Sequence, residues 1–304
     1  MSEDMAGGVT DFASLEPLEG GWSGETFVAR VGGGSGGGER QVVRIYARDP
    51  ARAEVDAALL RLVRGLVPVA EVLDVRPATG EMPALLVTSF LPGVRGDLLL
   101  PDLDDAALAT VGRHVGDLVA TLGGMPVLRP GELAGPDLQV RPWDGPDGLP
   151  GWVEAHLPAL AHWTDDERAG LRAVAHDAQE LLDTVDRSCL VHSDLNPKNL
   201  LLDPDTLEVT GLLDWEFAHA GHPFTDLGNV LRFERRPAYQ DAVLAAYHHR
   251  RGVPAPEALA LARAADLWAL VDLASRRDAN PVAARAHDLL RAVATGFDTP
   301  PPGA

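Results

Sequence analysis

Short hydrophobic runs in the first ninety residues predict β-strands. Two strands are expected within residues 15–31, joined by a turn that contains Gly21, Ser23 and Gly24, and a third strand at Gln41–Ala47. The apolar run Ala84–Phe90 is followed by a Leu-Pro-Gly sequence that ends a strand. Residues 32–38 contain only glycine and serine, and we expect a hairpin tip there, to which we assign no function.

Helical spacing dominates elsewhere. Asp49 and Pro50 have the residue types of a helix cap and a first helical position. The helix that follows is expected to turn its apolar residues from Val55 to Val63, including Leu62, toward the interior. Residues 125–150 are rich in proline, glycine and aspartate and predict an ordered loop or insertion rather than a domain linker. The other predicted helices are Leu103–Leu122, Trp152–Leu160, Asp166–Leu182, Tyr239–Arg250, Pro256–Ala274 and Val282–Ala294.

Between the helices lies a predicted β-hairpin, formed by the apolar runs Leu200–Leu202 and Val209–Leu213 and an Asp-Pro-Asp-Thr turn. Asn199 stands just before the first strand and Asp214 just after the second. A hairpin places these two positions at the same end, so their side chains are expected to converge. One amide and one carboxylate suit Mg²⁺, which takes its remaining oxygens from water and phosphates.

Asp194 lies five residues before Asn199 and is not needed for the metal, so its carboxylate can accept a proton from a nucleophile. The spacing H-x-D-x-x-x-x-N, which starts at His192, followed by an aspartate on the next strand, is the division of roles used in phosphoryl transfer by kinases. The segments HSDLNPKN and LLDWEFA resemble the catalytic loop and the metal-binding segment of the aminoglycoside phosphotransferase-like small-molecule kinases.

This resemblance covers roughly residues 15–290 and implies an α+β, two-lobed, protein-kinase-like fold. Residues 1–91 would form a small β-rich nucleotide-binding lobe, and residues 92–304 a larger, mostly helical catalytic and substrate lobe. ATP, with GTP as an alternative, would bind together with Mg²⁺. Asp194 would be the catalytic proton acceptor, and Asn199 and Asp214 would hold the metal. His192 and Asp226 would support the catalytic loop structurally.

The resemblance also implies nucleotide-binding positions in the first lobe. Arg44, on the third predicted strand, and Glu54, on the following helix, match the basic and acidic residues that hold nucleotide phosphates in kinases. Arginine replaces the more familiar lysine, but it can clamp phosphate oxygens with two nitrogens. Main-chain groups near Ser89 and Leu91 would meet the adenine ring. Glycines in the turn at Gly21, Ser23 and Gly24 would let the backbone approach phosphates.

Composition narrows the class of partner. The chain has 304 residues with 26 basic and 45 acidic side chains, a net charge of −19. So acidic a surface repels nucleic acid and anionic lipid and attracts cationic ligands. With one cysteine, Cys189, no internal disulfide can form, and no apolar run is long enough to span a membrane. We therefore expect a cytoplasmic enzyme, either monomeric or dimeric.

The acidic balance favours a small cationic, hydroxyl-bearing acceptor. Glu216, Asp266 and Asp272 are candidates for the pocket that binds the cation. Within the family, such an acceptor suggests an aminoglycoside or a basic peptide antibiotic, and hence a resistance enzyme. Two alternatives share all these motifs: a metabolic kinase for a small alcohol such as choline, homoserine or a sugar, and a nucleotide-binding pseudokinase without transfer activity.

Overall fold

The computed structural model describes residues 12–17, 25–31, 39–80 and 82–296. These residues divide into two compact units. Unit 1 comprises the described residues up to Gly93 together with Ala134–Gln139, and unit 2 comprises Val94–Leu133 and the described residues from Val140 onward. The sequence-based boundary at residues 91 and 92 lies two residues from this division, and the inclusion of Ala134–Gln139 in unit 1 was not expected.

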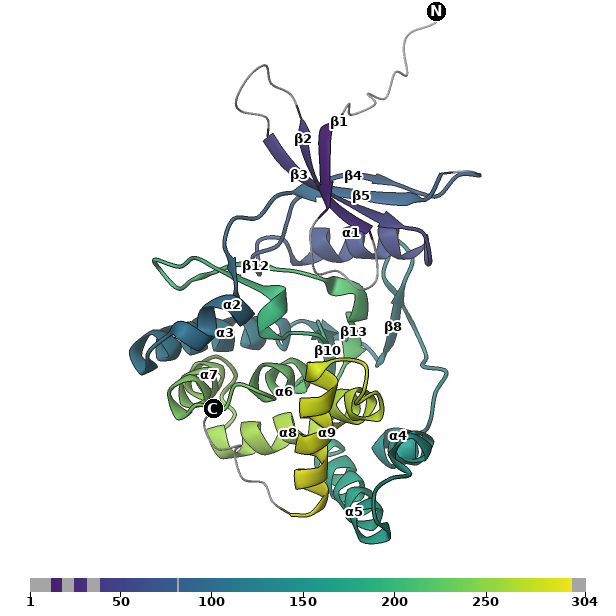
Figure 1. Ribbon diagram of the computed structural model, residues 1–304, viewed down its shortest axis with the longest axis vertical. Helices are drawn as coiled ribbons and strands as arrows, with labels where there is room; N and C mark the ends of the chain where they lie inside the picture. Colours follow the sequence, from purple (N-terminus) through teal and green to yellow (C-terminus); the bar gives the residue numbers. More distant parts are fainter. Residues whose placement is uncertain (1–11, 18–24, 32–38, 81, 297–304) are drawn as a thin grey trace, which may run out of the picture. The chain divides into compact units, whose positions relative to one another are not determined.

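Unit 1 contains an antiparallel five-stranded sheet in the order β1-β2-β3-β5-β4, drawn in purple and blue in Figure 1. The expected strand pair within residues 15–31 is confirmed, because β1 pairs with β2. The strand around Arg44 and the apolar strand are also confirmed, and these two strands pair with one another. The strands are β1 (Phe12–Pro17), β2 (Glu25–Val31), β3 (Glu39–Tyr46), β4 (Val72–Arg76) and β5 (Ala84–Ser89).

The helix of unit 1, α1 (Arg52–Val63), packs against β4 and β5. Its start differs from the prediction, because the N-cap is Ala51, without a side-chain cap, and not Asp49. Leu62, predicted to face inward, is 49% exposed. Alanines and leucines surround much of this helix, so the sequence pattern does not fix which side meets the sheet.

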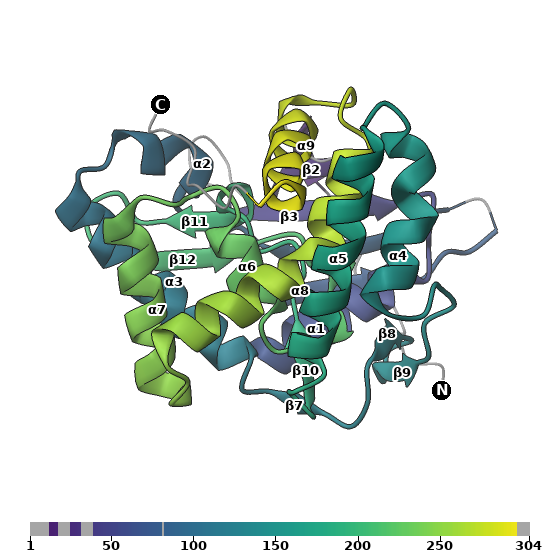
Figure 2. The same cartoon turned by 90° about the horizontal axis from the view of Figure 1, so that it is seen from below.

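Unit 2 is mostly helical. Helices α4, α5, α8 and α9 pack against one another, both as sequence neighbours and as distant pairs, and Figure 2 shows α5 beside α4 and α8. The predicted helices are confirmed, with shifts of a few residues at their ends. The helices are α2 (Gly96–Leu99), α3 (Asp105–Leu122), α4 (Gly148–His156), α5 (Asp165–Leu182), α6 (Thr225–Leu231), α7 (Pro237–Arg251), α8 (Ala255–Ser275) and α9 (Pro281–Ala294). No helix of the described residues is long and apolar enough to cross a membrane.

The segments between these helices contain strands that form two small sheets. One has the order β7-β10-β13-β8-β9, and the other has the order β12-β11-β6. Residues 125–150, expected to be an ordered loop or insertion, contain three short strands. Of these, β7 pairs with β10 and β8 with β13, which are distant in the sequence, whereas β9 adds to the sheet beside β8. Pairing with distant strands leaves no local pattern in the chain. The strands are β6 (Val94–Arg95), β7 (Pro126–Val127), β8 (Gly131–Ala134), β9 (Gln139–Arg141), β10 (Ser188–Val191), β11 (Leu200–Leu202), β12 (Val209–Leu212) and β13 (His219–Gly221).

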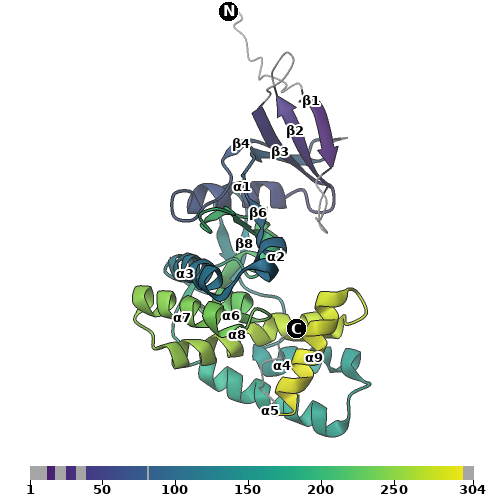
Figure 3. The same cartoon turned by 60° about the vertical axis from the view of Figure 1, so that its left-hand side comes forward.

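Two glycines on α3 allow α3 and α7 to lie close together, as Figure 3 shows. A Cβ atom added at Gly112 would lie 2.7 Å from the carbonyl oxygen of Tyr239, and one at Gly116 would lie 2.5 Å from that of Val243. These distances are far below van der Waals contact, and the opposing atoms belong to the backbone. Glycine is therefore required at these positions for the helices to pack as observed.

We predict that Gly116→Ala lowers the free energy of unfolding by about 1–3 kcal/mol, because the added methyl group forces α3 away from α7. Alanine also brings a gain of about 1 kcal/mol to a helix interior, so the expected loss is the clash with the backbone of α7 less this gain. Urea unfolding of the two proteins measures the difference. Gly145→Ala is the matched control, because a Cβ there would meet nothing within 4 Å. Equal stability of Gly116→Ala and the parent protein would contradict the close-packing argument.

Candidate active site

The predicted hairpin is confirmed and brings Asn199 and Asp214 to the same end. Strands β11 and β12 are antiparallel, with Leu200 opposite Leu212. One residue further, the N–H of Leu213 donates to the carbonyl oxygen of Asn199 at 2.8 Å. Asp214, the next residue, therefore lies beside Asn199 because of the backbone register alone.

Asp194 is held by two amide side chains. Its Oδ1 accepts from Nδ2 of Asn196 at 2.8 Å, and its Oδ2 accepts from Nδ2 of Asn199, also at 2.8 Å. Burial raises the pKa of Asp194, while the hydrogen bonds from Asn196 and Asn199 oppose the rise. The arrangement fixes a carboxylate whose basicity exceeds that of an aspartate in water. Sequence reasoning did not assign Asn196, although it stands inside the quoted motif.

The negative charge of Asp214 adds to the rise in the pKa of Asp194. The backbone of Asp214 is left-handed, with φ 58° and ψ 73°, at the start of the 3-10 helix Trp215–Phe217. The amide nitrogen of Asn199 donates to Asp194, so Oδ1 of Asn199 is the atom that can ligate a cation. One amide oxygen and one carboxylate fit Mg²⁺, which needs few protein ligands. Among the described residues no group of three His, Cys, Asp or Glu side chains could hold a metal by itself.

Asp226 and His192 tie the catalytic loop to the rest of unit 2. The buried Asp226 carboxylate accepts from the N–H groups of His192 and Ser193 at 2.9 and 2.8 Å. Nε2 of His192 bonds to the carbonyl oxygen of Leu213, and its Nδ1 accepts from the N–H of Asp194 at 3.3 Å. Burial lowers the pKa of His192 to about 4 and raises that of Asp226 to about 6. His192 is therefore neutral at pH 7 and not a proton carrier.

In unit 1, the predicted pairing of Arg44 with Glu54 is corrected. Nη1 of Arg44 lies 4.0 Å from Oδ2 of Asp56, which is 3% exposed. Asp56 also accepts from the hydroxyl of Tyr46 and from Nε of Arg52, each at 2.6 Å. Glu54 stands two residues away, a rotation of about 200° around the helix, and is half-buried. The carboxylate that meets the third strand is therefore that of Asp56.

The other predicted nucleotide-binding positions of unit 1 are only partly described. Gly21, Ser23 and Gly24 lie outside the described residues. The N–H of Ser89 donates to the carbonyl oxygen of Glu71 at 2.9 Å, and the N–H of Glu71 donates to Oγ of Ser89. Ser89 is therefore fixed against the segment that leads into β4, and Leu91 follows it in a half-buried position. Their roles toward a nucleotide stay predictions.

Two of the three predicted substrate carboxylates are occupied by arginines. Asp266 is buried and bonds to Arg232 through both oxygens, with a closest distance of 2.7 Å, so its charge is already neutralised. The assignment of Asp266 to a cation pocket was wrong, because sequence alone does not reveal its long-range partner Arg232. Asp272 shares an exposed ion pair with Arg276 one turn further along the helix, and its role toward a cation stays a prediction. Glu216 is half-buried and follows Asp214 by two residues.

Comparison with solved structures identifies the fold. The chain is similar to aminoglycoside phosphotransferase APH(4)-Ia in a complex with AMP-PNP and hygromycin B, with a TM-score of 0.66 and 21% identity over 95% of this chain and 96% of that one. It is also similar to aminoglycoside 2'-phosphotransferase-IIIa in its GDP complex, with a TM-score of 0.67 and 16% identity over 94% of each chain. The fold is thus aminoglycoside phosphotransferase-like and α+β, as expected.

The sequence profile of the phosphotransferase enzyme family matches residues 14–262, so the chain belongs to this family. The members of this family are phosphotransferase enzymes. Among curated proteins, it is 32% identical over 93 residues to the mouse acyl-CoA dehydrogenase family member 11 and 36% identical over 55 residues to the rat protein. These matches cover 25% and 18% of the chain, and only 12% and 7% of those longer proteins.

We predict that Asp56→Asn lowers the free energy of unfolding by about 2–4 kcal/mol, because it removes the charge that Tyr46 and Arg52 contact in a buried position. Glu54→Gln is the matched control and should change it by less than about 0.5 kcal/mol. Urea unfolding of the three proteins provides the comparison. Equal losses of unfolding free energy in the two variants would contradict the stabilising role of the Asp56 carboxylate.

A second prediction concerns pH. The folded pKa of His192 lies near 4, below its ordinary value of 6.5, so the unfolded chain binds more protons between these values and stability rises as pH increases from 4 to 6.5. His192→Gln removes this titrating group. The change in the free energy of unfolding between acidic and neutral pH should therefore be smaller by about 2–3 kcal/mol in this variant.

Urea unfolding at pH 4.5, 5.5 and 7 measures this change. Asp226, whose pKa is raised, makes the free energy of unfolding fall as pH rises, which is the opposite trend. Because Asp226 is present in both proteins, its contribution cancels in their difference. Parallel stability curves for the parent protein and His192→Gln would disprove the buried neutral imidazole.

Proposed function

We propose that the protein transfers the terminal phosphoryl group of ATP to a hydroxyl group of a small cationic molecule. The observation that carries this proposal is the arrangement of Asp194, Asn199 and Asp214: one half-buried carboxylate with a raised pKa, held by the amide of Asn199, and a second carboxylate at the same end of the hairpin. This is the set of groups that phosphoryl transfer requires from the protein. The nucleotide complexes of the similar structures, with AMP-PNP and GDP, support a nucleoside triphosphate as donor.

In this proposal, Asp194 orients the acceptor hydroxyl and takes its proton as that oxygen bonds to the terminal phosphorus and the bond to the nucleoside diphosphate breaks. Asn196 and Asn199 hold the carboxylate in place during the transfer. Mg²⁺, bound by Asn199 and Asp214, would neutralise the phosphate charge. Arg44 is proposed to bind phosphate oxygens, with Asp56 orienting its guanidinium.

The acceptor is proposed from charge and from similarity. A net charge of −19 attracts cations, Glu216 adds a carboxylate near Asp214, and a similar structure binds hygromycin B. On this basis an aminoglycoside or basic peptide antibiotic is the first candidate, and antibiotic resistance would follow.

One observation favours a second candidate. Asp266 is buried and paired with Arg232, so one of the three carboxylates expected to hold a polycation is already neutralised, and Asp272 shares an exposed ion pair with Arg276. A small amino alcohol or neutral alcohol needs fewer carboxylates than an aminoglycoside does. A metabolic small-alcohol kinase is therefore the alternative function.

We predict that Asp194→Asn lowers phosphoryl transfer at least about a hundredfold, because an amide cannot accept the hydroxyl proton. ATP binding, measured by calorimetry, should change by less than about threefold, because Asp194 does not bind the nucleotide in this proposal. The exposed Asp186→Asn is the matched control and should retain full transfer.

The assay is mass spectrometry of acceptors that gain one phosphoryl group, with ATP and Mg²⁺. The panel contains aminoglycosides, basic peptide antibiotics, small amino alcohols and neutral alcohols. Transfer to a cationic antibiotic supports the first candidate, and transfer to small alcohols alone selects the second. Undiminished transfer by Asp194→Asn would reject the catalytic role of this residue.

A further inference from the structure

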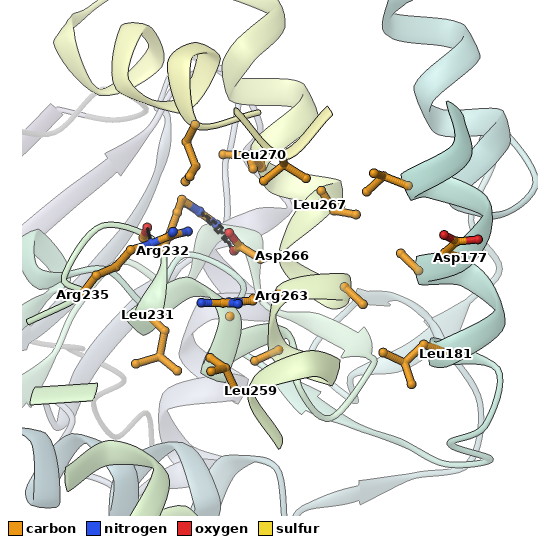
Figure 4. Close-up of a pocket in the computed structure, with 17 residues that line it drawn as sticks. Asp177, Leu181, Leu231, Arg232, Arg235, Leu259, Arg263, Asp266, Leu267 and Leu270 are labelled. Atoms are coloured by element: carbon orange, nitrogen blue, oxygen red, sulfur yellow. Dashed lines mark hydrogen bonds and ion pairs between the residues drawn. The ribbon is translucent and has the colours of Figure 1, made fainter. Parts of the chain in front are cut away.

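Unit 2 contains a cavity of about 300 Å³ among helices α5, α6, α8 and α9. Apart from five charged residues, its lining consists of leucine, valine, alanine and one glycine. Leu181, Leu259, Leu267 and Leu270 supply much of the apolar wall, as Figure 4 shows. Its volume lies at the lower end of the range of small-molecule sites, and such an apolar wall suits a hydrocarbon chain or ring.

The charged residues of the lining have a net positive charge. Three arginines, Arg232, Arg235 and Arg263, stand against two aspartates, Asp177 and Asp266. In Figure 4 the arginines lie on one side of the cavity, and Asp177 lies across from them on α5. The net charge of the lining is therefore opposite in sign to that of the whole chain, which is −19. A cavity with this lining selects against the cations that the rest of the surface attracts.

Arg232 is the charged group best placed to meet a ligand. It is 6% exposed, and its Nε and Nη2 donate to Asp266. Within the described residues only Nε and Nη2 of Arg232 donate to Asp266, and its Nη1 is not among the fully buried unsatisfied nitrogens, so this third nitrogen is accessible in a residue that lines the cavity. A carboxylate is the ligand that satisfies such donors with the strongest hydrogen bonds.

We propose that this cavity is a binding site for a small amphipathic carboxylate, whose apolar part lies among the leucines and whose anion meets the arginines. The site is distinct from the residues of phosphoryl transfer, and yet it is connected to them. Asp266 accepts from Nδ2 of Asn229, whose Oδ1 accepts from the N–H of Leu195, the residue after Asp194. Occupation of the cavity therefore acts on a group that is hydrogen-bonded to the catalytic loop.

Calorimetric titration of the full chain without nucleotide tests the proposal, using octanoate, 1-octanol and octylamine as probes of equal chain length. Octanoate should bind with a dissociation constant below about 1 mM, and octanol and octylamine at least tenfold more weakly. Binding of octanoate and octanol with equal affinity would overturn the proposal, as would the absence of octanoate heat up to about 10 mM. Because no nucleotide or acceptor is present, the result is independent of the proposed phosphotransfer.

Two variants locate the site. Arg263→Glu reverses the charge of the lining at an exposed position, and Val174→Trp fills the cavity from a half-buried position on α5. Each should weaken octanoate binding at least tenfold. The exposed Arg113→Glu on α3 is the matched control for net charge and should change the affinity by less than twofold. Equal affinities of Arg263→Glu and Arg113→Glu would place any octanoate site elsewhere.

Discussion

The hydrogen bonds from two consecutive backbone N–H groups to the buried carboxylate of Asp226 are the constraint on which the site depends. They hold His192 and Ser193, and Ser193 has a left-handed backbone with φ 66°. A non-glycine residue in this region costs on the order of 1 kcal/mol, so the conformation persists only where other contacts fix it. Asp214, also left-handed, marks the second such point. The left-handed conformation of Ser193, on the loop that leads to the hairpin, is therefore held by a carboxylate from another element.

The sequence was sufficient for the parts of the site that local pairing determines. Asn199 and Asp214 flank a hairpin whose two strands are adjacent in the chain, so their convergence follows from a short turn and its register. Asp194 belongs to the loop that enters the same hairpin. The strands of unit 1 follow from equally local signals, namely short apolar runs and the breaks between them.

Residues whose partners are distant in the chain could not be assigned in this way. The choice between Glu54 and Asp56 depends on the rotation of α1 over its sheet, and alanine and leucine occur on several sides of that helix. Asp266 appeared to be a free carboxylate because its partner, Arg232, lies 34 residues away on another element. Neither the phase of a helix nor a long-range ion pair leaves a signal in one sequence.

The pairing of Asp266 with Arg232 also bears on the pKa of Asp194, which burial raises. The positive charge of Arg232 is among the influences that lower the pKa of Asp194, together with the amides of Asn196 and Asn199. An unpaired arginine in a buried position would stabilise the ionised carboxylate more strongly and make it a weaker base. Asp266 offsets that charge, so burial remains the dominant influence on Asp194. The long-range ion pair thus preserves the basicity of the carboxylate that is proposed to accept the hydroxyl proton.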